Sequence, residues 1–135
     1  MDDDIDHVDI RVSDIERSRA FYEAALAPLG WHARAPETDP SGGTEIGFGR
    51  SAGTQFAIHS PTAEPGQDTV TTGMHVAFRA ENREAVHAFH AAAVAAGGRD
   101  IGAPGPRTAY SEGYYGAFVL DPDANNVETV WHAHD

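Results

Sequence analysis

Hydrophobic and polar positions alternate near the start of the chain, and the period then lengthens. Between Asp6 and Val12, polar residues alternate with branched apolar ones, which predicts a half-buried strand. From Ile15 to Leu29, apolar residues recur every four positions on one face, which predicts a helix. Ser13-Asp14 offers an N-cap for this helix, and Gly30 is a good residue to end it.

Short strands and turn formers make up the rest of the first half. Residues 31–35 predict a second strand, and the polar stretch 36–43 predicts a loop. Residues 45–49 and 55–59 are expected to pair as a hairpin. The stretch 60–72, which contains two prolines and a glycine, predicts a linker.

The same order of elements returns after the linker. Residues 74–79 predict a strand, residues 83–96 an alanine-rich helix, and residues 99–101 a short strand. A loop rich in glycine and proline precedes a strand over 115–120. Residues 121–126 then favour a tight polar turn, because Pro122 fixes its own φ and the neighbouring Asp and Asn side chains bond locally. The return strand over 127–131 carries Glu128 on the face opposite to its apolar neighbours.

The two halves also match residue by residue at one constant offset. The matched pairs run in register from strand through helix to its stop: His7-Val8 with His75-Val76, Ile10-Arg11 with Phe78-Arg79, Ala20-Phe21 with Ala88-Phe89, and Gly30 with Gly98. Each match alone is weak, but together they indicate an internal duplication. The duplication places His7 and His75 at equivalent positions.

The composition narrows the function classes. The chain has 135 residues, enough for one domain or two small halves that share a core. It has no apolar run long enough to span a membrane, and the acidic start Met1-Asp2-Asp3-Asp4 is unlike an export signal, so we expect a cytoplasmic protein. Without cysteine, any metal must be held by histidine, carboxylate or amide oxygen.

The charge balance makes nucleic acid an unexpected partner. The formal net charge is -12, and phosphate binding needs a basic patch. The nine basic residues are all arginine. The excess of acidic residues has two interpretations. It is either a general bias in the composition of the surface, or it forms an acidic groove that binds a cationic ligand.

Two histidines and one carboxylate are the candidate metal ligands. Duplicated halves usually meet about a pseudo-twofold axis, which would bring His7 and His75 to opposite sides of one cavity. A buried Glu128 needs a partner. The three residues together form the ligand set of a facial site with open positions, suited to a divalent Fe, Mn, Ni or Zn ion.

A fourth ligand would come from the first half, on the strand that corresponds to the one carrying Glu128. Ala57 takes the equivalent position and cannot bind a metal. Gln55 and His59 flank it on the same strand face, and either could reach in. The alternative is that both are polar side chains of an edge strand and do not bind the metal. We therefore expect a site with three ligands. The remaining histidines are expected to be surface or terminal residues: His32, His87, His90, His132 and His134.

Tyrosines precede the strand that neighbours Glu128. Tyr110 and Tyr114 could donate hydrogen bonds to a bound oxyanion or act as acid/base groups, or could simply pack at a cavity mouth. Glu112 is a candidate base, and Arg107 a candidate anion clamp.

The sequence resembles the vicinal oxygen chelate superfamily, which includes glyoxalase I, extradiol dioxygenases, fosfomycin-resistance enzymes and bleomycin-resistance proteins. The resemblance covers nearly the whole chain and rests on these segments: residues 7–14 with Arg19-Ala20-Phe21-Tyr22, residues 73–78, and Asp121-Pro122-Asp123 with Asn126-Val127-Glu128. It implies an α+β fold of two tandem βαβββ modules that form a curved mixed sheet around a central cavity. The expected bounds are about 5–60 for module one, 61–72 for the linker and 73–135 for module two, within a single domain over 1–135.

The resemblance also bears on function. Family metal ligands map onto His7, His75 and Glu128, and Ala57 departs from the glyoxalase pattern, which has a glutamate there. The leading hypothesis is a metal-dependent lyase, isomerase or dioxygenase whose divalent ion chelates two neighbouring oxygens of a small substrate. The alternative is a metal-free protein that sequesters a small molecule, as in the bleomycin-resistance branch. The resemblance makes a homodimer plausible.

Overall fold

The first half of the chain folds as a strand, a helix and a set of further strands. The computed structural model describes residues 4–133. The elements are β1 (Val8–Arg11), α1 (Ile15–Leu26), the 3-10 helix η1 (Ala27–Leu29), β2 (His32–Ala33), β3 (Glu37–Thr38), β4 (Thr44–Gly49) and β5 (Phe56–His59). The strands form one sheet in the order β1-β5-β4-β2, with β3 also paired to β4. β1 runs parallel to β5, and β4 antiparallel to it.

The second half repeats this plan. Its elements are β6 (His75–Arg79), α2 (Arg83–Ala95), β7 (Arg99–Pro106), β8 (Tyr114–Leu120) and β9 (Asn126–His132), in a sheet ordered β6-β9-β8-β7. The registers agree as well as the order, because Asp9 lies opposite Ala57 in β5 and Ala77 lies opposite Glu128 in β9. The predicted α+β fold with two βαβββ modules is confirmed, and Ala57 is the counterpart of Glu128.

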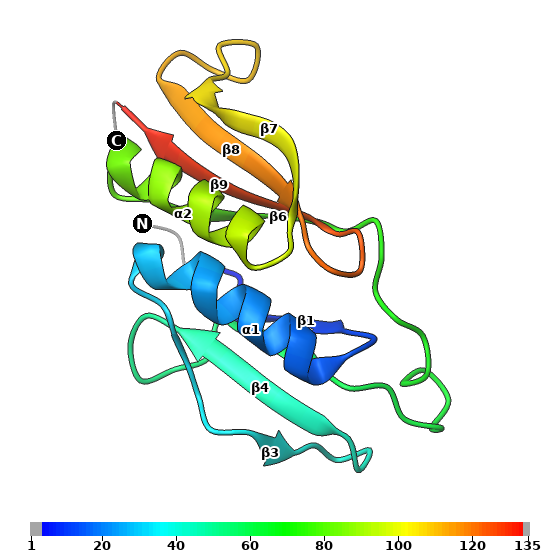
Figure 1. Cartoon of the computed structure of the whole chain (residues 1–135). Coiled ribbons are helices and arrows are strands. Elements are labelled where there is room, and N and C mark those ends of the chain that lie inside the picture. The colour runs from blue at the N-terminus through cyan, green and yellow to red at the C-terminus, as the bar shows by residue number, and fades with distance from the viewer. Residues whose placement is uncertain (1–3, 134–135) are drawn as a thin grey trace.

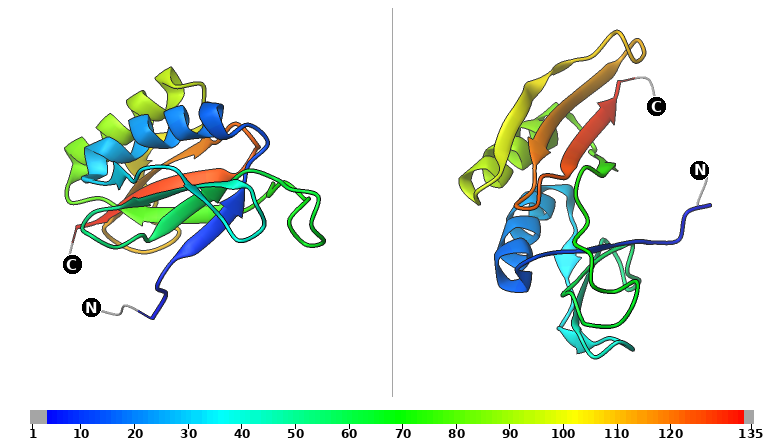
Figure 2. Two further views of the ribbon diagram at one scale, coloured as in Figure 1. Left: turned by 90° about the horizontal axis from the view of Figure 1, so that it is seen from below. Right: turned by 90° about the vertical axis from the view of Figure 1, so that its right-hand side faces the viewer.

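Both helices cover the same side of the molecule. α1 and α2 lie side by side, with the strands behind them (Figures 1 and 2), and the edge strands β1 and β6 lie toward the middle of the molecule. The buried apolar residues between helices and sheets form one cluster that draws on both modules. Phe78 of β6 joins the halves, with ring centroids 5.2 Å from Trp31 and 5.4 Å from Phe56.

The predicted turn between β8 and β9 connects the two modules. Asp121 accepts hydrogen bonds from the backbone of its own turn and, at 2.5 Å, from the buried hydroxyl of Tyr22 in α1. Asp123 accepts from the backbone N–H of Ser13 at 3.0 Å, just before α1. Asn125 donates to the carbonyl of Thr71 at 2.9 Å. The turn therefore holds both the first helix and the linker.

Three elements differ from the sequence-based expectation. The first α-helix ends at Leu26 and continues as η1, because Pro28 has no N–H for a regular helical bond. Gly30 then takes φ 83, as expected of a helix stop. Residues 37–38 form the short strand β3 within the predicted loop. β7 continues to Pro106 through the predicted Gly/Pro loop, because an edge strand tolerates prolines and register shifts.

Residues 61–72, the expected linker, have no helix or strand, and they contact β1. The backbone of Thr71 donates to the carbonyl of Arg11 at 2.8 Å, and the Arg11 side chain donates to the carbonyl of Gly66 at 3.2 Å. Among residues 4–133, no helix is long and apolar enough to cross a membrane.

Candidate functional site

Module two brings His75 and Glu128 into contact on the open face of its sheet. His75 is the first residue of β6, and its neighbour on the same face, Ala77, lies opposite Glu128 in β9. Nε2 of His75 and Oε1 of Glu128 lie 2.8 Å apart in a hydrogen bond. The Glu128 side chain is only 3% exposed, whereas that of His75 is 51% exposed. A buried carboxylate thus meets an imidazole that solvent can reach, and of the two candidate histidines His75 is the one that contacts Glu128.

Tyr114 completes this group. It begins β8, next to β9, and its hydroxyl donates a short hydrogen bond to Oε2 of Glu128. Burial of the phenol raises the Tyr114 pKa, and the hydrogen bond and negative charge of Glu128 raise it further. Tyr114 therefore remains protonated at neutral pH and acts as a donor to the carboxylate, not as a base.

A cavity of about 370 Å³ opens beside His75. It is lined by His75, Ile101, Gly102, Arg107, Tyr110, Phe118 and Asn126. The Arg107 guanidinium lies 5.3 Å from the centroid of the Phe118 ring, a cation–π contact. The Tyr110 ring packs on Tyr114 at 5.0 Å. Of the other sequence candidates, Arg107 and Tyr110 therefore lie at the cavity, while Glu112 is exposed in the preceding turn and does not line it.

His7 is in different surroundings. It lies just before β1, its side chain is 55% exposed, and Nδ1 is 2.6 Å from Asp6 and Nε2 3.8 Å from Asp9. The hydrogen bond to Asp6, followed by the charge of Asp9, raises the pKa of His7. His7, His75 and Glu128 do not form a group with all ligand atoms within 4.8 Å in the described chain.

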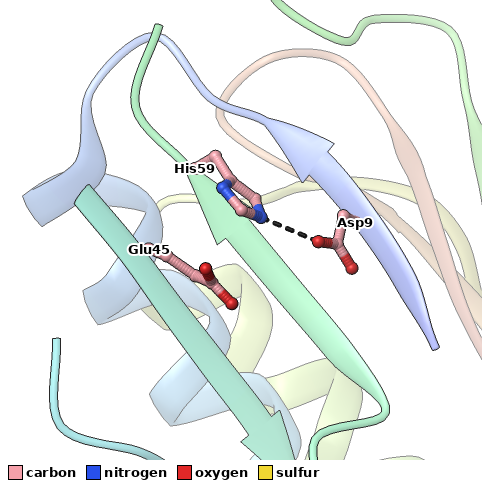
Figure 3. Close-up of side chains that lie close together, drawn as sticks. All are labelled: Asp9, Glu45 and His59. Atoms are coloured by element: carbon pink, nitrogen blue, oxygen red, sulfur yellow. Dashed lines mark hydrogen bonds and ion pairs between the residues drawn. The ribbon is translucent and has the colours of Figure 1, made fainter. Parts of the chain in front are cut away.

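Module one has a second cluster, formed by Asp9, Glu45 and His59. Their ligand atoms all lie within 4.8 Å of one another, and across residues 4–133 this is the group of three that could hold a metal ion. Figure 3 shows the side chains on one face of three neighbouring strands, β1, β4 and β5. Nε2 of His59 lies 2.8 Å from Asp9.

A third carboxylate contacts the other nitrogen of His59. Nδ1 lies 2.9 Å from Oδ2 of Asp39, whose side chain is 4% exposed. The His59 bond, together with bonds from Ser41 and Gly43, lowers the pKa of Asp39 to about 2. Burial lowers the pKa of His59, but the bonds to Asp39 and Asp9 and the charges of Asp9 and Glu45 outweigh it, so the net shift is upward.

The remaining candidates divide between the two modules. His59, proposed as a fourth ligand, lies in the module-one cluster. Gln55 is half-buried, and its Oε1 has no hydrogen-bond partner in the part of the chain that is described. Of the histidines expected at the surface, His32 and His87 are exposed, His90 and His132 are half-buried, and His134 lies outside the described residues.

Sequence reasoning missed Asp9, Glu45 and Asp39. Asp9 could have been found, because it alternates onto the same face as His7 in the first predicted strand. Glu45 could have been placed opposite His59 by counting outward from the hairpin turn. No pattern in the sequence indicates that Asp39 contacts His59, because the position of Asp39 depends on the path of a loop.

Comparison with known proteins identifies the relatives. A family model described as "Glyoxalase/Bleomycin resistance protein/Dioxygenase superfamily" matches residues 4–129. A glyoxalase/bleomycin resistance protein from Albidiferax ferrireducens T118 is 33% identical, with a TM-score of 0.75, over 93% of this chain and 96% of that one. No curated protein matches the chain.

Two further solved structures share the fold. One is a glyoxalase/bleomycin resistance protein/dioxygenase family enzyme from Burkholderia phytofirmans PsJN, with 22% identity and a TM-score of 0.67 over 96% of this chain and 98% of that one. The other is a point mutant of FosX, the fosfomycin resistance protein of Listeria monocytogenes, complexed with Mn(II) and 1S,2S-dihydroxypropylphosphonic acid. It is 21% identical, with a TM-score of 0.63, over 98% of this chain and 94% of that one.

Proposed function

The chain belongs to the glyoxalase/bleomycin resistance protein/dioxygenase superfamily, and on that premise we propose that it is a metal-dependent enzyme acting on a small oxygenated molecule. The metal ligands in module two would be His75 and Glu128. The observation that carries the proposal is their contact beside a cavity, with Glu128 buried and His75 open to that cavity. A buried carboxylate with a neighbouring imidazole is a donor set suited to a divalent Fe, Mn, Ni or Zn ion. The Mn(II) in the FosX relative is consistent with this choice.

The side chains around the pair have separate proposed roles. A divalent ion, when bound, would polarise two neighbouring oxygens of the substrate as a Lewis acid. Tyr114 would hold one oxygen of Glu128 by its hydrogen bond and so fix the orientation of the carboxylate. Tyr110 and Arg107, at the cavity, would donate hydrogen bonds to negative charge on the substrate. Lyase, isomerase and dioxygenase reactions all fit this arrangement.

We propose His7 as the third ligand, supplied by a second copy of the chain. Within one chain, His7 contacts Asp6 and Asp9, and it does not join His75 and Glu128 in a group with metal-ligand spacing among the described residues. A homodimer could bring His7 of one copy to the His75–Glu128 pair of the other.

Metal analysis tests the module-two ligands. The protein is purified without an affinity tag or chelator, and its metal content is measured by plasma mass spectrometry. His75→Ala and Glu128→Gln should each lower the content by one ion per chain. The control is His32→Ala, which removes an exposed histidine of β2. Equal metal content in all four proteins would contradict the proposal.

Mixing two variants tests the shared site. His7→Ala and His75→Ala chains are unfolded, mixed and refolded together. If His7 comes from the second copy, each mixed dimer has one intact site, and the mixture binds more metal than either variant alone. No gain on mixing, although the dimer forms by light scattering, would exclude a ligand from the second copy.

A metal-free binding protein is the second candidate function. The observation in its favour is that His75, Glu128 and Tyr114 already satisfy one another by hydrogen bonds. A protein that only sequesters a ligand would keep most of its ligand affinity in Glu128→Gln, whereas the enzyme would lose metal and activity together.

A further inference from the structure

Module one has a polar cluster that the module-two site does not use. We propose that it is a separate site for a divalent transition-metal ion. The ligands are Nε2 of His59 and the carboxylates of Asp9 and Glu45, and Asp39 orients the histidine.

The strand pairing brings the three ligands together. Glu45 in β4 lies directly opposite His59 in β5, and Asp9 is on the adjacent β1. All three side chains lie on the same face, as Figure 3 shows. Metal–nitrogen and metal–oxygen bonds are about 2.0–2.2 Å, so two neighbouring ligand atoms around one ion lie roughly 3 Å apart. The 2.8 Å between His59 and Asp9 is near this separation, and Glu45 is within reach of the same point.

Asp39 determines which nitrogen of His59 faces the cluster. Its Oδ1 accepts from the backbone of Ser41 at 3.0 Å and of Gly43 at 2.9 Å. The other oxygen, Oδ2, lies 2.9 Å from Nδ1 of His59. A carboxylate cannot donate, so this bond places a proton on Nδ1, and a metal ion in the cluster would bind the lone pair of Nε2. A carboxylate behind a histidine is the usual support of a metal-bound imidazole.

A positive charge is required between His59 and Asp9. An unprotonated Nε2 and a carboxylate oxygen are both acceptors, and 2.8 Å is too close for two acceptors without a cation between them. That cation is either a second proton on the ring or a metal ion. Three carboxylates converge on this one imidazole, and a single proton neutralises them less than a divalent ion does. Asp9 is 39% exposed, which leaves the cluster open to an ion and its water ligands.

The site is not a repeat of the His75–Glu128 pair. The pair Arg11–His59 in module one corresponds to Arg79–Val130 in module two, and Asp9 corresponds to Ala77. Module two therefore has apolar residues where module one has two of its ligands. Module one in turn has Ala57 where module two has Glu128. The polar groups of the two modules therefore lie at different positions along equivalent strands.

Zinc titration in the absence of the other site tests the proposal. The parent protein is the full chain carrying His75→Ala, stripped with chelator and titrated with ZnCl2 by calorimetry. We expect one Zn²⁺ per chain. His59→Ala and Asp9→Asn in this background should lower the affinity at least about 100-fold, since each removes a ligand. Asp9 is half-exposed at the surface, so its variant tests the site even where His59→Ala does not fold. His32→Ala is the matched control and should leave the affinity unchanged.

Asp39→Asn tests the orienting role. Loss of a carboxylate behind a metal-bound histidine lowers metal affinity by about 10- to 100-fold. We expect this loss of zinc affinity under conditions where circular dichroism shows the metal-free variant to be folded, which separates the orienting role from a loss of folding. Unchanged zinc binding in His59→Ala and Asp9→Asn would overturn the proposal and leave a protonated His59 between its carboxylates.

Discussion

Tyr114 is the residue through which the buried carboxylate of module two is held in place. Tyr114→Phe keeps the ring that packs on Tyr110 and removes the hydroxyl that donates to Glu128. We expect the metal affinity of the His75–Glu128 site to fall by about 10- to 100-fold, the usual cost of losing such a partner. Calorimetric titration measures it, and Tyr115→Phe is the control, because that hydroxyl contacts His87. Equal affinities in both variants would mean that Tyr114 does not position Glu128.

Tyr22 makes stability sensitive to alkaline pH. Its burial, and then the charge and hydrogen bond of Asp121, raise its pKa well above 10. The stabilising contribution of a group whose pKa is raised on folding is complete below its ordinary pKa and is lost as pH rises through the raised value. Tyr22→Phe should lower the free energy of unfolding by about 1–3 kcal/mol at pH 7. It should also weaken the decline above about pH 10. Urea unfolding at pH 7 to 11 measures both effects; an equally steep alkaline decline in the variant would contradict this role.

The sequence alone predicted part of the candidate site at the residue scale. His75 and Glu128 could be paired because strand alternation and the internal repeat both depend on short, regular spacings. Matching the strand of residues 55–59 to the one that carries Glu128 placed Ala57 where the glyoxalase pattern has a glutamate. Asp39 could not be predicted, since its contact with His59 depends on the course of residues 36–43.

Among the elements, the turn between β8 and β9 stabilises a helix of the other module. Asp123 accepts from the backbone and hydroxyl of Ser13, at the start of α1, and also lies 3.7 Å from Arg17. Asp123→Ala removes these contacts, and we expect it to cost about 1–2 kcal/mol, as loss of a helix cap does. Urea unfolding gives the value, with Asp68→Ala, an exposed carboxylate of the linker, as control. A cost no larger than that of the control would show that the turn does not stabilise α1.

The type of an element could be predicted where its hydrophobic pattern repeats over many residues. The exact bounds of the elements could not. Both helices and the hairpin of β4 and β5 are present where expected. β3 was missed because two residues give no period to read, and its pairing with β4 depends on a contact distant in the sequence. β7 was predicted too short, because prolines argue against a central strand but not against an edge strand.

For the whole molecule, the excess of acidic residues should oppose folding. With a net charge of -12, repulsion between carboxylates is partly relieved when the chain unfolds. Raising sodium chloride from low to physiological concentration screens this repulsion, so we expect the melting temperature at pH 7 to rise by a few degrees. Calorimetry near pH 4.8, the isoelectric point expected from the sequence, is the control and should show little effect. A melting temperature at pH 7 that falls with added salt would mean that attractive ion pairs outweigh the repulsion.

The linker over residues 61–72 joins two modules that are already held together by the shared core and by the turn between β8 and β9. We infer that the modules would stay associated without the covalent connection. We expect residues 1–64 and 67–135, produced as two separate polypeptides, to reassemble on mixing into a complex with the far-ultraviolet circular dichroism of the intact chain. Fragments that stay unfolded or apart on mixing would show that the connection is needed to form the interface. Reassembly would let each module be isotopically labelled or altered by itself, so that metal bound to one half could be distinguished spectroscopically from metal bound to the other.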